Sequence, residues 1–173
     1  MGGPIAQLMA RDRADTVAGV VLCATSSHWT DARQRLLWRS LALLRLGLGL
    51  TPDFAWRRGL RLAGFPASAV TTWTTSELTR GSAVDLAEAG RELSNWDSRP
   101  WLEDLDVPAT VIVTARDGGV PPAHQRELAR LLRAATIEID ADHGAAISDH
   151  HTFNAALLEA LATMTAAKPA LAA

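Results

Sequence analysis

Three short apolar runs stand out along the chain, at residues 16–24, 109–115 and 135–140. The first two are rich in β-branched residues and run continuously, without alternating with polar positions. Continuous runs of this kind are typical of strands that are buried on both faces of a parallel sheet. The sequence therefore predicts three buried strands.

Apolar residues at helical spacing separate these runs. The spacing predicts helices over residues 4–13, 121–132 and 149 to about 164. Gly2 and Gly3 indicate a tight turn into the first helix, whose first turn begins with Pro4. The order of helix, strand, long insert, strand, helix, strand and helix predicts an α/β fold.

The insert, from about residue 26 to residue 100, has a different character. It holds five of the six tryptophans and no convincing strand pattern. Helices are expected over the leucine-rich stretch 37–48, from the Thr51-Pro52 pair, near 67–78, and after Ser82, where Asp85 completes a box-like cap. We expect a helical domain at 29–100, inserted into a core formed by 1–28 and 101–173.

The composition of the chain argues against nucleic-acid-binding, membrane-spanning and disulfide-rich secreted proteins. The chain has 173 residues, 48% of them hydrophobic, and a net charge of −2, so it lacks the basic surface that nucleic acids or anionic membranes require. The longest apolar stretch, 36–50, is about 15 residues long and holds two arginines, short of the roughly 20 residues that span a bilayer. One cysteine and the absence of a signal-peptide pattern at the start predict a cytoplasmic protein without disulfides.

The strongest chemical signal lies after the second and third strands. Asp117 directly follows the run at 109–115, and His143 follows the run at 135–140. Functional groups of α/β sheets gather beyond the carboxyl ends of strands, so these side chains are expected to meet. A carboxylate that orients an imidazole is the acid–base half of a nucleophilic triad. Asp142 is an alternative acid, poorly placed beside His143, and Asp140 is expected to end the strand.

The other polar residues near strand and helix ends are expected to have mainly structural or solvent-exposed roles. Ser26, Ser27 and His28 follow the first strand and either contact a substrate or, as we favour, cap the first helix of the insert. His150 and His151 are expected to be solvated at the start of the last helix, and Cys23 to belong to the core. No histidine or cysteine spacing predicts a metal site, and Gly118-Gly119 lacks the lysine of a phosphate-binding loop, so no cofactor is predicted.

The segments RDGGVPP and DADHGA, with an acid and then a histidine after late strands, resemble the α/β-hydrolase superfamily. The opening MGGPIAQLMARDRADTVAGVVLCAT resembles the segment directly after the nucleophilic serine in that family. The resemblance covers residues 1–27 and about 101–164. It implies a partial α/β-hydrolase fold with the last three parallel strands, their flanking helices and an inserted helical lid.

The resemblance also implies an activity. It assigns Asp117 and His143 to the triad of an ester-type hydrolase for small apolar substrates, with a serine expected directly before Met1. The backbone N–H of Met1 would then belong to the oxyanion hole. Without the serine the chain is expected to be a truncated or mis-started, inactive form. Relatives with an aspartate nucleophile or peroxidase activity are alternatives.

A non-catalytic role is the competing hypothesis. The chain would then be a remnant that binds a hydrophobic ligand or a protein partner. Its first strand is expected to leave an exposed sheet edge, which favours self-association.

Overall fold

The computed structural model describes residues 2–29 and 83–167, with a few isolated positions between these ranges. The chain divides into two compact units, one formed by residues 1–28 and 98–173 and the other by 29–97. Residues 98–100, which the sequence placed in the insert, thus belong to the first unit. Ser98 explains this, because its hydroxyl donates to Gln7 Oε1 at 2.7 Å and its backbone N–H donates to the Ser27 carbonyl at 2.8 Å.

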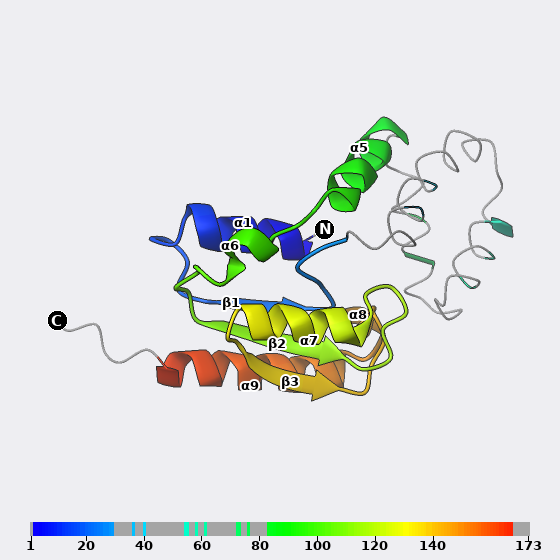
Figure 1. The fold of residues 1–173 in the computed structure, drawn as a ribbon. Helices are drawn as coiled ribbons and strands as arrows, with labels where there is room; N and C mark the ends of the chain where they lie inside the picture. Colours follow the sequence, from blue (N-terminus) through cyan, green and yellow to red (C-terminus); the bar gives the residue numbers. More distant parts are fainter. Residues whose placement is uncertain are drawn as a thin grey trace. The chain divides into compact units, whose positions relative to one another are not determined.

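The first unit is built on a parallel sheet of three strands in the order β1-β2-β3 (Figure 1). The strands are β1 at Val20–Cys23, β2 at Ala109–Thr114 and β3 at Ala135–Ile139. All three predicted strands are therefore confirmed in position. The first is shorter than predicted, because the preceding residues turn back on the end of the first helix, with Thr16 N–H donating to the Arg13 carbonyl at 2.9 Å.

Helices connect and cover the strands. They are α1 at Gly2–Asp12, the short α6 at Arg99–Leu102, α7 at Pro122–Leu131, the short α8 at Ala145–Ser148, and α9 at His150–Ala167. The predicted helices are confirmed with small shifts at their ends, whereas the short α6 and α8 have no counterpart in the prediction. The tight turn expected at Gly2 and Gly3 is wrong, because α1 already begins at Gly2. No helix in the described ranges is long and apolar enough to cross a membrane.

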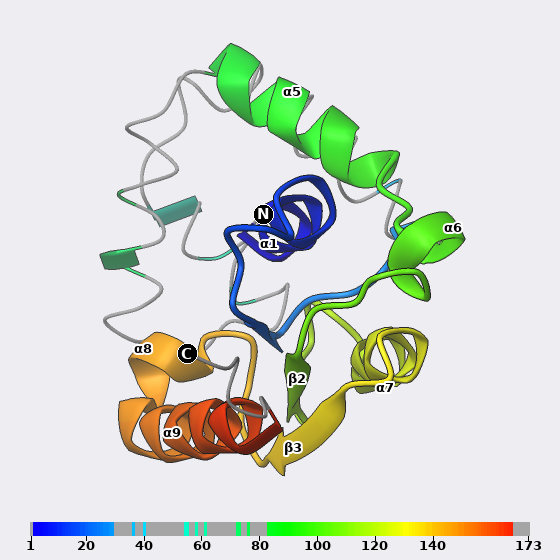
Figure 2. The same cartoon turned by 90° about the vertical axis from the view of Figure 1, so that its left-hand side faces the viewer.

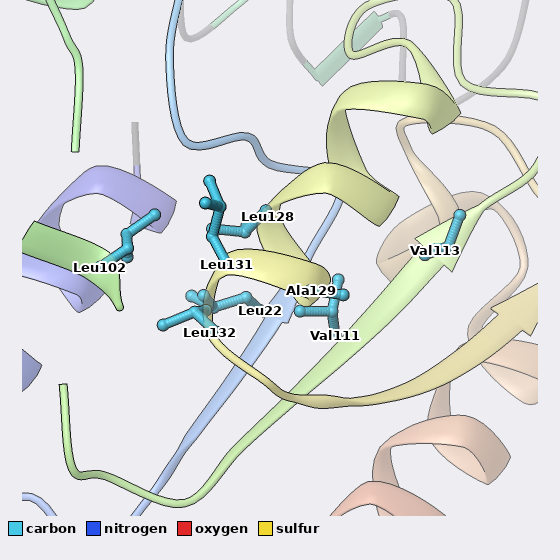
Figure 3. Close-up of a cluster of buried hydrophobic side chains, with 8 residues drawn as sticks. All are labelled: Leu22, Leu102, Val111, Val113, Leu128, Ala129, Leu131 and Leu132. Atoms are coloured by element: carbon cyan, nitrogen blue, oxygen red, sulfur yellow. The ribbon is translucent and has the colours of Figure 1, made fainter. Parts of the chain in front are cut away.

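The sheet carries a separate hydrophobic layer on each face. Helix α7 packs on one face and α9 on the other (Figure 2). Strand β2 serves both layers, since Val111 and Val113 join the α7 side whereas Ile112 joins the α9 side. The α7 layer, drawn in Figure 3, also includes Leu22 and Leu128. The continuous apolar run of β2 is therefore explained by burial on both faces.

Strand β3 is less buried than the sequence predicted. Three of its five residues are exposed, and only Ile139 is fully buried. Among the described strands β3 pairs with β2 alone, so it lies at an edge of the sheet. Its isoleucines face the α9 layer, whereas Glu138 forms an exposed ion pair with Arg126 at 2.7 Å.

Little of the second unit is described. Helix α5 at Ala83–Ser94 confirms the helix expected after Ser82. The Trp29 N–H donates to the Trp96 carbonyl at 3.0 Å, so the two ends of the insert meet. The other helices expected in the insert lie outside the described residues, and so does Met1 with its expected oxyanion-hole N–H.

Candidate active site

The loops that follow β2 and β3 run side by side. The Ala115 N–H donates to the Ile139 carbonyl at 2.9 Å, and the Arg116 N–H donates to the Ala141 carbonyl at 3.0 Å. These bonds continue the pairing of the strands by two residues. The next side chains on the two loops, Asp117 and His143, are brought together in this way.

Asp117 is an acid buried in a shell of donors, and its side chain has no exposed surface. The main-chain N–H groups of Gly119 and Val120 donate to Oδ1 at 2.8 and 2.7 Å. The Thr114 hydroxyl and the Gln125 amide donate to Oδ2 at 2.9 and 3.1 Å. Burying a carboxylate is costly unless it is hydrogen-bonded, and these four donors supply the compensation.

His143 completes the shell from the solvent side. Its Nδ1 lies 3.0 Å from Oδ2 and 3.2 Å from Oδ1 of Asp117, while 41% of its side chain is exposed. An ionised carboxylate only accepts hydrogen bonds, so Nδ1 carries the ring proton and Nε2 of the neutral ring keeps a lone pair. The arrangement can therefore take up and return a proton at Nε2.

The two other aspartates near His143 serve different groups. Asp142 Oδ1 accepts the Gly144 N–H at 2.8 Å and the Ser148 hydroxyl at 3.2 Å, which stabilises the start of α8. Asp140 forms an exposed ion pair with Arg116 at 2.8 Å. Asp117 is therefore the acid that the structure places against His143.

A second polar cluster follows β1, where the chain turns through Ala24 with a positive φ of 51°. The Ser26 hydroxyl donates to the His28 carbonyl at 2.9 Å, and the Ser27 hydroxyl lies 3.1 Å from His28 Nδ1. These hydroxyls thus bond within their own segment. The helix that they were expected to cap lies outside the described residues.

His28 also approaches α7. Its ring lies 5.1 Å from the ring of His124, centroid to centroid, and its Nδ1 lies 3.8 Å from Glu127 Oε2. Only 10% of the His28 side chain is exposed. The cluster therefore joins the end of β1 to the helix that follows β2.

The remaining predicted positions are simple to place. Burial, with a smaller contribution from the negative charge of Asp117, raises the pKa of the Cys23 thiol to about 11, so Cys23 is unsuited to act as a nucleophile near neutral pH. His150 and His151 open α9 and are exposed, as predicted. Within the described ranges no three histidine, cysteine or acidic side chains are grouped to hold a metal ion.

The sequence interpretation missed two residues of the site, Thr114 and Gln125. Both are fully buried. Gln125 occupies the same face of α7 as Leu128 and Ala129, at helical spacing. A glutamine on an apolar helix face is a visible signal, because a buried amide must find polar partners.

Comparisons with known proteins bear on the fold of the chain. Neither protein-family models nor curated proteins give a match to the chain. Among solved structures, a hydrolase from Pseudomonas aeruginosa PA01 matches with a TM-score of 0.74 at 21% identity, over 92% of this chain and 61% of that one. The enol-lactonase from Burkholderia xenovorans LB400 matches with a TM-score of 0.77 at 24% identity, over 94% and 63%.

A thermophilic esterase from Thermogutta terrifontis matches with a TM-score of 0.68 at 21% identity, over 94% of this chain and 62% of that one. The chain therefore has the fold of the later part of an α/β hydrolase, as its sequence resemblance implies. It spans less than two thirds of the length of each of these three structures.

Proposed function

We propose that Asp117 and His143 are the acid and the general base of a serine hydrolase that acts on small apolar esters. The observation that carries the proposal is the 3.0 Å contact between a fully buried carboxylate and a half-exposed imidazole. That division suits the two roles, because the acid needs a fixed, water-free position and the base must reach the substrate.

Each residue has a defined task in this chemistry. A serine hydroxyl attacks the ester carbonyl while His143 Nε2 takes its proton, and His143 then returns the proton to the leaving alcohol, which leaves the acyl group on the serine. Water attacks this acyl-serine in the second half, with His143 taking the water proton and returning it to the serine oxygen as the acid is released. Asp117 keeps the proton on Nδ1 and stabilises the imidazolium that forms. The names of two matched structures, an esterase and an enol-lactonase, support ester-type substrates for this chain.

The serine is proposed to lie directly before Met1, as the sequence resemblance implies. The close approach of α1 to the end of β1 supports this position. A Cβ at Gly3 would lie 2.0 Å from Thr25 Oγ1, so the start of α1 is held against the segment that follows β1. A nucleophile placed at this helix start is typical of a strand-to-helix elbow.

A fluorophosphonate probe tests the proposal. It should label the serine in the chain extended by its upstream coding sequence, and the 173-residue chain serves as the control that stays unlabelled. Labelling should fall sharply in the extended chain when His143 is replaced by Gln. An extended, folded chain that neither reacts with the probe nor hydrolyses nitrophenyl acetate or butyrate would remove the proposal.

Association through β1 is the second candidate. Of the described strands, β1 pairs only with β2, and three of its four residues are only half-buried. An unpaired strand edge is a template for pairing with another chain. The 173-residue chain should therefore sediment as dimers or larger species, and a stable monomer at micromolar concentration would exclude this candidate.

A further inference from the structure

Gln125 is a polar side chain in the middle of a buried helix face. It is fully buried on α7, beside residues that line the hydrophobic layer on that side of the sheet. A buried amide is destabilising unless its oxygen and its nitrogen both find partners. The partners of Gln125 therefore show what this residue holds in place.

The orientation of the amide follows from one main-chain bond. Gln125 Oε1 accepts the backbone N–H of Thr114 at 3.0 Å. A backbone N–H only donates, so the oxygen must face β2 and the amide nitrogen must face the other way. Nε2 then lies 3.1 Å from Asp117 Oδ2, 3.0 Å from Thr114 Oγ1 and 2.9 Å from the Val120 carbonyl.

The two oxygens of Asp117 are held by different kinds of donor. Oδ1 receives main-chain N–H groups from the loop itself, whereas Oδ2 receives the side chains of Thr114 and Gln125. Oδ2 is also the oxygen closer to His143 Nδ1. The Thr114 hydroxyl has a single proton, and the charged Oδ2 at 2.9 Å is a stronger acceptor for it than Gln125 Oε1 at 3.2 Å. Of the two protons on Nε2, one goes to the Val120 carbonyl and the other is shared between Oδ2 and Thr114 Oγ1, so Gln125 acts on Oδ2 directly or through Thr114.

We infer, resting on the function proposed above, that Gln125 is a positioning residue for the general base. It holds Asp117 Oδ2 where that oxygen accepts the Nδ1 proton of His143, and so favours the ring tautomer in which Nε2 carries a lone pair rather than a proton. Without Gln125 the main-chain donors still hold Oδ1 and the Thr114 hydroxyl still donates to Oδ2, but Oδ2 loses one of its two side-chain donors and the carboxylate is held less firmly against His143.

The test measures the tautomer of His143 in the full 173-residue chain, labelled with ¹⁵N at histidine. At a pH where the ring is neutral, long-range ¹H–¹⁵N spectra separate the Nδ1–H from the Nε2–H form, and a His143→Gln variant identifies the signal by its loss. Gln125→Met keeps the length of the side chain and removes its donors. We expect the dominant Nδ1–H form of His143 to give way to a mixture with the Nε2–H form.

A second buried glutamine supplies the matched control. Gln7 is 1% exposed; its amide donates to the Ser26 carbonyl after β1 and accepts from the Ser98 hydroxyl before α6, and neither partner is hydrogen-bonded to Asp117. Gln7→Met removes a buried amide in the same way but should leave the His143 tautomer unchanged.

A folded Gln125→Met chain with the tautomer of the unaltered protein would overturn the inference. If Gln125→Met does not fold, Thr114→Val removes the relaying hydroxyl and should shift the tautomer in the same direction; an unshifted tautomer overturns the inference equally. The readout needs neither a substrate nor a nucleophile. A chain that shows the shift but no probe labelling after extension would therefore reject the hydrolase and keep the positioning role.

Discussion

Two pairs of a histidine and an acidic residue lie close together in the described part of the chain, and the pairs differ in which partner is buried. At the ends of β2 and β3 the side chain of Asp117 has no exposed surface while that of His143 is 41% exposed. At the end of β1 the order is reversed, since the side chain of His28 is 10% exposed and that of Glu127 is 35% exposed.

The distances reinforce this difference. His143 Nδ1 lies 3.0 Å from its carboxylate, whereas His28 Nδ1 lies 3.8 Å from Glu127 and is closer to the Ser27 hydroxyl, at 3.1 Å. A buried acid with an accessible imidazole makes a base that can meet a substrate. A buried imidazole among hydroxyls and a second ring instead connects two elements of the fold. Proximity of the two residue types does not by itself distinguish these roles; burial does.

The largest effect on turnover should come from replacing His143, with His28 as the comparison. In the chain extended to include the proposed serine, His143→Gln should lower ester turnover by about 10⁶-fold, the size of loss seen when a triad base is removed. Stability should change little, because the side chain of His143 is half-exposed. Rates with a nitrophenyl ester and urea unfolding curves measure both quantities.

His28→Gln is the matched variant and should behave in the opposite way. It should lower the free energy of unfolding by about 1–3 kcal/mol, because it disturbs a buried hydrogen-bonded group, and leave turnover within a few-fold. Equal losses of turnover in His143→Gln and His28→Gln would contradict the assignment of a catalytic role to His143 and a structural role to His28.

A smaller effect on turnover is expected when the acid keeps its shape and loses its charge. Asp117→Asn in the extended chain should reduce turnover by about 10⁴-fold, because an amide in this position favours the wrong imidazole tautomer. Substrate affinity should be nearly unchanged, which separate measurement of kcat and KM reveals. Glu127→Gln is the counterpart in the second cluster, and a comparable loss there would contradict the assignment.

Cys23 reports the buried charge of Asp117. Its pKa is raised from 9.0 to about 11, first by burial and then by that charge, so alkylation by iodoacetamide at pH 8 should be about a hundredfold slower than for an exposed thiol. Asp117→Asn removes one of the two causes and should speed up alkylation in the folded chain. An unchanged alkylation rate would show that the charge of Asp117 does not act on the Cys23 thiol.

The same shift makes stability depend on pH in the alkaline range. The folded state favours the neutral thiol, so the contribution of Cys23 to stability is complete below pH 9 and is lost as the pH rises through about 11. Cys23→Ser should weaken this loss, which urea unfolding curves at pH 8 and pH 10.5 would show.

The smallest effect is on stability and concerns the contact between the start of α1 and Thr25. Gly3→Ala places a Cβ 2.0 Å from Thr25 Oγ1 and should cost about 1–3 kcal/mol of stability, as overpacking does. Gly2→Ala meets nothing within 4 Å and should be neutral or stabilising by up to about 1 kcal/mol. Thermal unfolding compares the two, and equal melting temperatures would show that α1 does not rest on Thr25.

The order of the main strands and helices and the pairing of Asp117 with His143 could be predicted from the sequence. The continuous run of β2 and the helical spacing of α7 and α9 indicated an α/β order, and the positions of Asp117 and His143 after neighbouring strands predicted their meeting. These features are local, so a periodic pattern is enough to detect them.

Other features depend on long-range packing and could not be predicted in the same way. The exposure of β3 follows from its place at the sheet edge, which its apolar composition does not reveal. The bonds of Ser27 and Ser98 join positions 71 residues apart. Gln125 was predictable only in part. Its place on an apolar helix face can be seen in the sequence, whereas its contact with Asp117 can be seen only in the structure.

The tautomer of His143 in the unaltered chain tests the central claim most directly. At a pH where the ring is neutral, ¹⁵N spectra should show the proton on Nδ1, held by Asp117, and Asp117→Asn should move it to Nε2. A His143 ring that carries its proton on Nε2 in the unaltered chain would contradict the account, because such a ring has no lone pair at Nε2 with which to take the proton of a nucleophile.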